Sequence, residues 1–532
     1  MVLWLLGSLA DLDAAPGAFA APTAGAPAGP ESAPASTPLS DRLSVMMRAP
    51  VLNPDETGVA VLLLPEGRPV FLRQANRPLQ PASTQKILTT AAALALLKPE
   101  FVYRTSLYAD TPIDGSGSIA GNLYIKGSGA PDLVGESWWL VVRRLANLGL
   151  RKVEGDLVAD ESYFDSVRRP TGWPQPSADS WYNAPIGALS CNFNVVTVTI
   201  DPSPILGARP DLTLSPAASY FQVMNRALTT AGPTSLAVTR SFEGGRNALV
   251  VSGTIRRGSG PAFFNRAVEE PPQYALTAFR EIAKREQIEI GGNLAVGSVP
   301  EKAREIHTHE SRPLGSLVRD MNKNSNNFMA EMLVKTLGAQ FVGTPGTTAG
   351  GLEVIRGYLA GLGIDLEGTR LADGSGLSDD DRLPARLLAE VLARAGADFE
   401  IGTDLISSLP IGGADGTLDE RFGGEGSRRR IRAKTGRVAG ALTLAGYAAN
   451  KDGRVLAFAV LANRPRGTID AVHRAIDRIV DEIAGSTNTD LGLPAASGVP
   501  EIRPDASTPP PAPTPRSDQA PKHAGSSRNS PP

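Results

Sequence analysis

The chain has 532 residues, with 53 lysines and arginines, 55 aspartates and glutamates, 55 glycines and 44 prolines. This length is sufficient for two or three domains, and the near-balance of charge excludes the basic surface that a nucleic-acid partner would require. The single cysteine, Cys191, excludes an intrachain disulfide framework and a cysteine zinc site. We interpret it as a small buried residue.

Both ends of the chain are predicted to lie outside the folded part. The N-terminus begins MVLWLLGSLA, which is shorter than the about 18 apolar residues of a membrane helix. Ala18-Phe19-Ala20 follows, a pattern typical of signal-peptidase sites. We therefore expect a weakly recognisable signal peptide, an extracytoplasmic location in the cell envelope or periplasm, and no stable membrane span. A disordered leader is the alternative for residues 1–37, and the Pro-rich residues 486–532 are predicted to be a disordered tail.

The first folded elements are a short helix near residues 41–48 and a hairpin. GVAVLLLP, the turn Glu66-Gly67 and PVFLRQA form the two predicted strands and their connection. An apolar helix follows the sequence PASTQK and ends before Pro99. Residues 100–300 then alternate strand-like segments with Gly and Pro turns, and helical patterns occur only near residues 136–147 and 272–286. We therefore predict an inserted β-rich module at residues 106–299, made of one or two small domains.

Helical patterns return in SLVRDMNKNSNNFMAEMLVKTLGAQF, GGLEVIRGYLAGLG and PARLLAEVLARAG. ALTLAGYAA, the turn Asn450–Gly453 and RVLAFAVLA form a second hairpin, and a last amphipathic helix covers residues 468–484. Without the inserted module, residues 38–105 and 300–485 predict an α/β (α+β) fold, in which an antiparallel sheet is flanked by helices.

Three short motifs carry residues suited to chemistry. Ser83 and Lys86 lie three residues apart at the start of the apolar helix, so their side chains share one face, and a desolvated lysine can remove a serine proton. The alternative is an ordinary helix start with a snorkelling lysine. Ser325-Asn326-Asn327 interrupts a helical pattern, which indicates either a turn facing a cleft or a plain N-cap.

Lys434-Thr435-Gly436 lies in a predicted strand. The lysine and threonine can hold a carboxylate, and Gly436 allows a ligand to approach the backbone closely. The alternative is a surface strand with a turn glycine. Each of the three motifs is weak alone, but S-x-x-K, S-x-N and K-T-G occur here in the order found in penicillin-binding proteins and serine β-lactamases.

The spacing narrows this resemblance. Ser325 follows Ser83 by 242 residues (325 − 83), far more than a compact β-lactamase uses. Over residues 40–484 the chain resembles the D-alanyl-D-alanine carboxypeptidase/endopeptidase family, the class C low-molecular-mass penicillin-binding proteins. Further segments that resemble this family are GNLYIKGSGAPDL, YNAPIGALSCNFNVVTVTIDP, LADGSGLS and SLPIGGADGTLDERF. The resemblance implies a penicillin-binding transpeptidase-like domain, no cofactor, no metal, peptidoglycan stem peptides as substrates and β-lactams as covalent inhibitors.

The resemblance also implies the catalytic roles. Ser83 attacks the carbonyl of the penultimate D-Ala and forms an acyl-enzyme, Lys86 accepts the serine proton, and Ser325 relays a proton to the leaving D-Ala. Asn327 holds the peptide chain of the substrate. Lys434, Thr435 and Gly436 line the site of the terminal carboxylate, and the backbone N–H groups of Ser83 and Arg437 form an oxyanion hole.

Two positions depart from the family pattern. Arg437 stands where the family carries a serine or threonine, and Asp379-Asp380-Asp381 follows DGSGLS where the family has an arginine and an asparagine. These three aspartates predict a more acidic rim of the cleft, whereas Asp373 and Ser375 are expected to shape the cleft.

Other readings of the sequence remain beside the peptidase. A penicillin-binding sensor or wall-binding scaffold with little turnover is the main alternative, and a β-lactamase is disfavoured because no E-x-x-L-N segment follows Ser325. His307 and His309 are interpreted as an exposed pair on a strand, since a zinc site needs three or four ligands. Carboxypeptidase and endopeptidase action, the diamino acid of the stem peptide and the oligomeric state are left open by the sequence.

Overall fold

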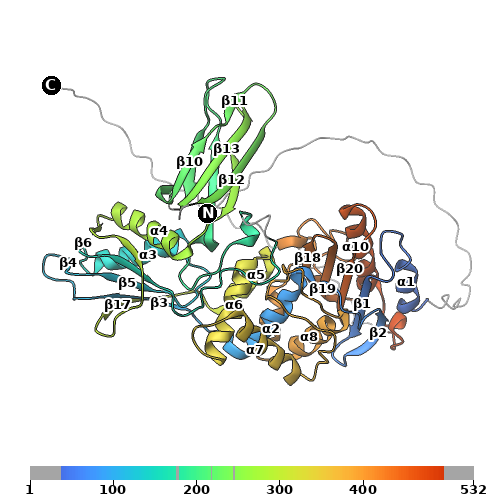
Figure 1. Ribbon diagram of the computed structural model, residues 1–532. Helices are drawn as coiled ribbons and strands as arrows, with labels where there is room; N and C mark the ends of the chain where they lie inside the picture. Colours follow the sequence, from blue (N-terminus) through green and yellow to red (C-terminus); the bar gives the residue numbers. More distant parts are fainter. Residues whose placement is uncertain (1–36, 175–178, 217, 244–245, 496–532) are drawn as a thin grey trace, which may run out of the picture. The chain divides into compact units, whose positions relative to one another are not determined.

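The computed structural model describes residues 37–174, 179–216, 218–243 and 246–495 (Figure 1). From Pro38 onward these residues form one compact unit. The predicted signal segment with Ala18-Phe19-Ala20 lies outside the described residues, as does the predicted tail from residue 496 onward. None of the described helices is both long enough and apolar enough to cross a bilayer.

The folded part continues past the predicted boundary at residue 486. Residues 486–495 include a 3₁₀ turn, η7 (Thr489–Leu491), in which Asp490 and Leu491 are buried. The Asp490 carboxylate accepts a hydrogen bond of 3.0 Å from Arg42 in the first helix, α1 (Leu39–Met46). The two ends of the described chain therefore pack together, which composition alone did not indicate.

A five-stranded antiparallel sheet with the order β18-β19-β20-β1-β2 forms the centre of the fold. Both predicted hairpins are confirmed, since β1 pairs with β2 and β19 pairs with β20. Its strands are β18 (Ile431–Val438), β19 (Ala441–Ala449), β20 (Val455–Asn463), β1 (Thr57–Leu63) and β2 (Arg68–Arg73). Every residue of β1 is buried, which indicates that both faces of the sheet are covered.

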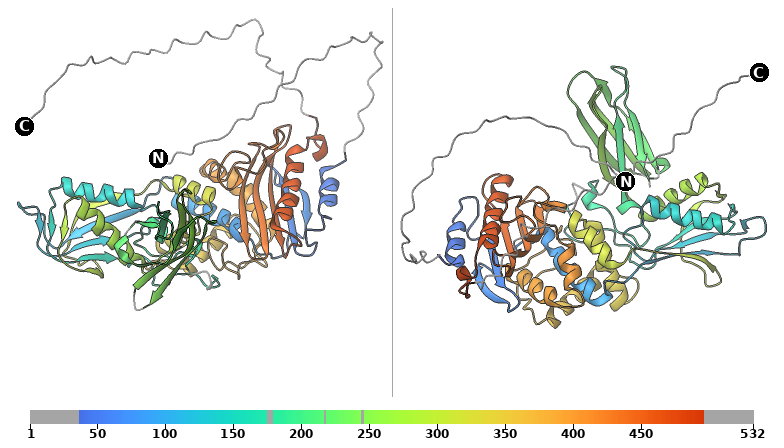
Figure 2. Two further views of the ribbon diagram at one scale, coloured as in Figure 1. Left: turned by 90° about the horizontal axis from the view of Figure 1, so that it is seen from above. Right: turned by 180° about the vertical axis from the view of Figure 1, so that it is seen from behind.

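The two faces of the sheet belong to different hydrophobic cores. In β1, Val59 and Val61 join the core formed with α1 and α10 (Ile469–Gly485), whereas Ala60 and Leu62 join the core on the other side. This follows from the alternation of side chains along a strand. Figure 2 shows the sheet between α1 and α10 on one side and a larger group of helices on the other.

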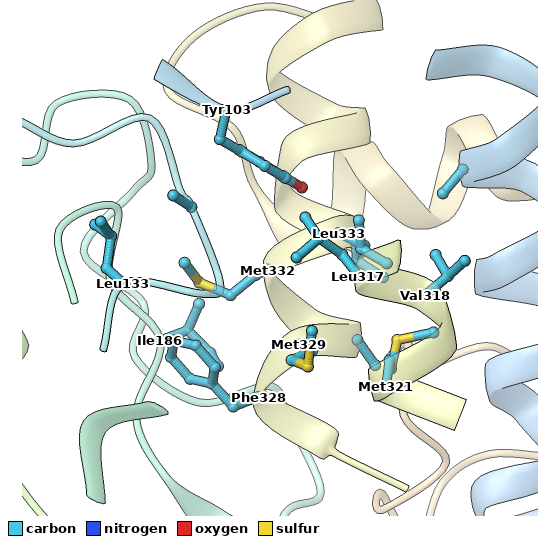
Figure 3. Packing of buried hydrophobic residues seen from close by; sticks show 14 of the residues in the cluster. Tyr103, Leu133, Ile186, Leu317, Val318, Met321, Phe328, Met329, Met332 and Leu333 are labelled. Atoms are coloured by element: carbon cyan, nitrogen blue, oxygen red, sulfur yellow. The ribbon is translucent and has the colours of Figure 1, made fainter. Parts of the chain in front are cut away.

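The larger group of helices carries most of the site. Its members are α2 (Lys86–Leu97), α5 (Leu314–Asn324), α6 (Asn327–Phe341), α7 (Thr348–Gly361), α8 (Ala385–Ala397) and α9 (Gly402–Ser408). All thirteen residues from Asn327 to Ala339 of α6 are buried. Figure 3 shows that α6 packs its apolar side chains against α5 and against the loops that carry Leu133 and Ile186.

Residues 104–310 form the β-rich part. The predicted helices are present as α3 (Gly135–Asn147) and α4 (Pro271–Arg285). A five-stranded sheet has the order β16-β7-β5-β3-β17, with β16 (Leu294–Val296), β7 (Leu157–Asp160), β5 (Leu123–Lys126), β3 (Arg104–Ala109) and β17 (Arg304–Glu310). Strands β3 and β17 pair at the two points where the chain enters and leaves this part.

Three smaller sheets complete the β-rich part. They are β15-β6-β4, β14-β8-β9, and β10-β13-β11 with β12 paired to β13. Their strands are β15 (Glu289–Ile290), β6 (Lys152–Val153), β4 (Ser118–Ile119), β14 (Ala262–Ala267), β8 (Val195–Asp201), β9 (Asp211–Ser215), β10 (Phe221–Asn225), β13 (Arg246–Arg256), β11 (Leu228–Thr230) and β12 (Ser235–Glu243). Cys191, just before β8, is fully buried as predicted.

Candidate active site

Ser83 lies in a tight turn that leads directly into α2. This 3₁₀ turn is η1 (Ala82–Gln85), and Ala82 has a φ of 48°, in the left-handed region that alanine rarely adopts. Two glycines pack against the turn: a Cβ at Gly376 would lie 1.9 Å from Ala82 O, and one at Gly436 would lie 3.0 Å from Pro81 O. Backbone packing therefore fixes the position of Ser83, which remains half-buried.

Lys86 is the first residue of α2, and its amine faces Ser83. Lys86 Nζ donates to Ser83 Oγ at 2.9 Å, to Asn327 Oδ1 at 2.7 Å and to the Ser375 carbonyl at 2.8 Å. The side chain is fully buried. Burial lowers the pKa of Lys86 to about 7, against the opposing effect of nearby acidic groups, of which Asp373 is the strongest. The snorkelling lysine considered as an alternative is therefore wrong.

Ser325 lies at the junction of α5 and α6, as the turn interpretation predicted. It closes α5 in the left-handed conformation, with φ 55° and ψ 40°. The N-cap of α6 is the next residue, Asn326, whose side chain accepts from Met329 N at 3.1 Å. The plain N-cap interpretation of Ser325 is therefore wrong, and its hydroxyl is available to accept a 2.8 Å hydrogen bond from Lys434 Nζ.

Asn327 connects the two halves of the site. Its Oδ1 accepts from Lys86, and its Nδ2 donates to the backbone carbonyl of Tyr182 at 2.9 Å. Tyr182 follows a segment of the β-rich part in which Trp173 Nε1 donates to Asp373 Oδ2 at 2.8 Å. The inserted part therefore contributes to the wall of the site, which the motifs did not predict.

Lys434 is fully buried in β18. It donates to the Thr435 carbonyl at 2.7 Å as well as to Ser325. Burial and the second lysine, Lys86, lower the pKa of Lys434 well below its usual value. The two buried amines lie close enough for Lys86 to disfavour the protonated form of Lys434, and an incoming carboxylate would stabilise that form.

The outer edge of β18 offers backbone donors to a ligand. Ala433 N donates to Pro410 O on the side away from β19, so the alternation of an antiparallel strand turns the N–H groups of Thr435 and Arg437 to that same open edge. Thr435 Oγ1 lies 2.8 Å from Thr417 Oγ1, and the Arg437 side chain is exposed.

Gly436 has a packing role that the sequence did not predict. A Cβ at this position would lie 2.1 Å from Thr443 Oγ1 and 3.0 Å from Ala82 Cβ. The close neighbours of Gly436 are thus the β19 threonine and the turn that precedes Ser83, and Thr443 Oγ1 in turn donates to Pro81 O at 2.8 Å. Gly436 allows the strand and the nucleophile turn to touch.

Asp373 organises the loop behind the nucleophile, as expected for a residue that shapes the cleft. It is fully buried, and its two oxygens accept from the backbone N–H groups of Ser375, Gly376, Leu377 and Ser378 at 2.6–3.0 Å.

The acidic rim predicted from the three aspartates that follow DGSGLS is only partly present. Asp379 is exposed, but Asp381 is fully buried and accepts from Gln85 Nε2 at 3.0 Å, because the loop turns inward after Asp380.

The motifs missed one buried acid, Glu331. It lies on α6, four residues after Asn327 and therefore on the same face, and is fully buried. A charged residue amid the apolar run NFMAEML was the available signal for Glu331.

The two histidines of β17 correct another prediction. His307 and His309 are half-buried rather than exposed, and burial lowers the pKa of both.

Comparison with known proteins places this geometry in a family. Residues 39–485 match the model of the D-Ala-D-Ala carboxypeptidase 3 (S13) family. The chain belongs to this family. The D-alanyl-D-alanine carboxypeptidase of Actinomadura sp. (strain R39) is 32% identical over 457 residues, 83% of this chain and 84% of the relative. D-alanyl-D-alanine carboxypeptidase DacB of Haemophilus influenzae is 28% identical over 385 residues, 72% of this chain and 80% of the relative. The predictions of the family and of a peptidase are confirmed.

Solved structures agree on the fold of this S13 member. The crystal structure of penicillin binding protein 4 (dacB) from Haemophilus influenzae has a TM-score of 0.72 at 24% identity, over 84% of this chain and 99% of that chain. The same protein complexed with a β-lactam has a TM-score of 0.68 at 25% identity, over 84% of this chain and 100% of that chain. The predicted α+β fold with an antiparallel sheet flanked by helices is confirmed.

Proposed function

We propose that this member of the S13 family is a serine-type D-Ala-D-Ala carboxypeptidase that cleaves peptidoglycan stem peptides through an acyl-enzyme on Ser83. The observation that carries the proposal is the 2.9 Å hydrogen bond between Lys86 Nζ and Ser83 Oγ. With a pKa of about 7 for Lys86, a large fraction of the amine is unprotonated at neutral pH. An unprotonated amine at this distance can act as the base that activates the serine.

Acylation follows from these contacts. Ser83 Oγ attacks the carbonyl carbon of the penultimate D-Ala, and Lys86 Nζ takes the hydroxyl proton. The charge that develops on the carbonyl oxygen meets the backbone N–H groups of Ser83 and Arg437, each donor contributing about 3 kcal/mol. The C–N bond to the terminal D-Ala breaks, and Ser325, which accepts from Lys434 at 2.8 Å, passes to the leaving amine the proton that Lys86 took from Ser83. Lys86 is then unprotonated again for deacylation.

Recognition of the terminal carboxylate rests on β18. The substrate peptide lies along the open edge of the strand, where Thr435 and Lys434 face it and where Gly436 brings the strand against the nucleophile turn. Carboxylate binding beside Lys434 offsets the burial that lowers the pKa of this lysine. Asn327 orients the peptide from the opposite wall. Substrates that end in a free carboxylate are thereby favoured.

Deacylation completes the cycle. Water attacks the acyl carbon, Lys86 takes a proton from the water, and Ser83 Oγ leaves with that proton. A β-lactam that resembles the D-Ala-D-Ala terminus would acylate the same serine, but its ring-opened leaving group stays attached to the acyl group. β-Lactams are therefore proposed as covalent inhibitors and peptidoglycan stem peptides as substrates.

A sensor or scaffold with little turnover is the second candidate, and one observation favours it. Arg437 stands where the family carries a hydroxyl residue, and its side chain is exposed. A carboxylate bound at Lys434 and Thr435 would then lack one hydroxyl partner. The backbone donor of Arg437 is unaffected by this change, which is why the peptidase is preferred.

The remaining parts of the proposal concern organisation and location. The sequence predicts a penicillin-binding domain from residues 38–105 and 300–485 with an inserted module from 106–299. Because β17 (Arg304–Glu310) pairs with β3, we propose that the inserted module covers residues 104–310. We also propose an extracytoplasmic protein of the cell envelope or periplasm, exported by the signal segment. The absence of a membrane-crossing helix among the described residues is compatible with that location.

Timed release of D-Ala separates the two candidates. The protein is incubated with a pentapeptide that ends in D-Ala-D-Ala, and free D-Ala is measured beside labelling by a tagged penicillin. Many turnovers per labelled site are expected, and the Ser83→Ala variant should release none. Labelling without multiple turnovers would support the sensor, and no labelling of the folded protein would exclude both candidates.

A further inference from the structure

A set of buried charged groups lies behind the nucleophile. Two amines and three carboxyl groups are all fully buried, namely Lys86, Lys434, Asp373, Asp381 and Glu331. Burying so many ionisable groups is costly unless their charges compensate each other. Two of the acids have clear local roles: Asp373 accepts four backbone N–H groups, and Asp381 binds Gln85. The function of Glu331 is not explained by the mechanism above.

Glu331 binds the backbone segment whose carbonyl oxygen accepts a hydrogen bond from Lys86. Its Oε1 and Oε2 both accept from Gly374 N, at 3.0 and 3.2 Å. The next residue along, Ser375, presents its carbonyl oxygen to Lys86 Nζ at 2.8 Å. Because a Cβ at Gly374 would lie 2.2 Å from Val334 Cγ2, the loop is pressed closely against α6, and Glu331 is the α6 side chain that binds its backbone.

The charged and titratable neighbours of the two groups come from several elements. Those that face Lys86 are Asp373 and Asp381 from the loop, Glu331 from α6 and Lys434 from β18. Those that face Glu331 are Lys86 from α2, Asp373 and the Ser375 hydroxyl from the loop, and Lys335 from the next turn of α6. Lys335 is already paired with Asp165 at 2.5 Å, and Lys86 also lies near Glu331.

We propose that Glu331 is a positioning residue for the Ser83–Lys86 pair: it fixes the Gly374–Ser375 backbone, whose carbonyl oxygen binds the amine. This inference rests on the proposed function, because it assigns what holds the base in place during acylation. The proton of Ser83 still passes to Lys86 Nζ, and no proton needs to move to Glu331. Glu331 acts through the backbone that it binds, and the acceptor at Ser375 O keeps Lys86 Nζ beside Ser83 Oγ.

The protonation state of Glu331 follows from the two ionisations. Burial, then the repulsion of Asp373, raise the pKa of Glu331 to about 8, and burial lowers the pKa of Lys86 to about 7. Below about pH 7, Glu331 is therefore mostly protonated, and replacing it by a neutral amide removes no charge in that range. Over the acid limb of Lys86, Glu331 acts through its hydrogen bonds to Gly374 N.

Two substitutions separate the hydrogen bond to Gly374 from the rest of the side chain. In Glu331→Gln the amide oxygen can still accept from Gly374 N, whereas in Glu331→Asp the shorter side chain withdraws from Gly374. If Glu331 only stabilised the fold, both variants would be acylated at the wild-type rate once folded. The matched control is Glu353→Gln, which changes an exposed glutamate on α7.

The experiment measures the rate of acylation by a tagged penicillin as a function of pH, using intact mass of the full chain, with thermal melting to confirm folding. Folded Glu331→Gln is expected to keep the wild-type plateau rate and acid limb, because its amide oxygen still accepts from Gly374 N. Folded Glu331→Asp should keep the limb and lose about tenfold or more in plateau rate, since a small misplacement of a catalytic group is costly. A wild-type plateau rate in folded Glu331→Asp would overturn the inference, whereas a wild type that is never labelled would overturn the proposed function instead.

Discussion

The loop behind the nucleophile, residues 373–378, should lose stability when Asp373→Asn replaces one carboxylate oxygen by an amide nitrogen. Its Oδ1 accepts from Ser375 N at 3.0 Å and Gly376 N at 2.6 Å, and its Oδ2 accepts from Leu377 N at 3.0 Å and Ser378 N at 2.8 Å. Trp173 Nε1 adds a further donor to Oδ2 at 2.8 Å. In Asp373→Asn, whichever position the amide nitrogen takes, at least two buried N–H groups face a donor in place of an acceptor.

The size of the effect can be estimated from these bonds. Hydrogen bonds to a charged group contribute about 1.5–3 kcal/mol each, and bonds that share one acceptor are not additive. Loss of the charge also relieves repulsion with Asp381, which offsets a part of the loss in stability. We expect the free energy of unfolding of Asp373→Asn to fall by about 3–5 kcal/mol. Because unfolding entropy grows with chain length, this corresponds to only about 3–5 °C in the melting midpoint.

Chemical denaturation measures this difference, with Asp379→Asn as the matched control. Asp379 lies on the same loop but is exposed, and its carboxylate accepts from Gln80 Nε2 at 3.1 Å, so its substitution should change stability by less than about 0.5 kcal/mol. Penicillin acylation of Asp373→Asn should also slow, since Ser375 O no longer lies correctly for Lys86. Equal stabilities of the two variants would refute the account of the loop.

The other predictions concern the base, the strand edge and the inserted part. Acylation by penicillin should fall about tenfold per pH unit below about 7, as Lys86 becomes protonated; a rate that is flat to pH 5 would contradict its role as the base. Gly436→Ala should abolish acylation in stopped-flow or mass assays, because its Cβ would lie 2.1 Å from Thr443 Oγ1. Lys335→Met leaves the half-buried Asp165 without its 2.5 Å partner, so we expect a loss of about 2 kcal/mol in urea unfolding; an unchanged midpoint would show that this link does not stabilise the fold.

Local patterns predicted the hairpins and helices well. The strands around Glu66-Gly67 and around Asn450–Gly453 were predictable because turn residues separate two apolar runs. The pairing of β3 with β17 was not, since Arg104 and its partner Glu310 are 206 residues apart (310 − 104) and no local pattern encodes such long-range register. The described part of the predicted tail was missed for the same reason: Asp490 is held by Arg42, from the other end of the chain.

The site residues divide in the same way, into those that a local pattern predicts and those that depend on contacts distant in the sequence. Ser83, Lys86 and Lys434 were predictable because a motif places each residue in a recognisable local structure. Asp381 was misplaced on the cleft rim, because a run of three aspartates is typical of a solvated loop, whereas this loop turns its third aspartate toward Gln85. Glu331 was overlooked because its partner, Gly374 N, is a backbone group that no sequence pattern reveals.

Peptide mapping after labelling with a tagged penicillin tests the central claim most directly, namely that the Lys86 amine activates the Ser83 hydroxyl. We predict one adduct per chain, on the peptide that contains Ser83, in the wild-type protein. Folded Ser83→Ala should carry no adduct, and Lys86→Met should acquire it at least a hundredfold more slowly, the scale of a lost general base. An adduct on another residue, or wild-type rates in Lys86→Met, would contradict the account.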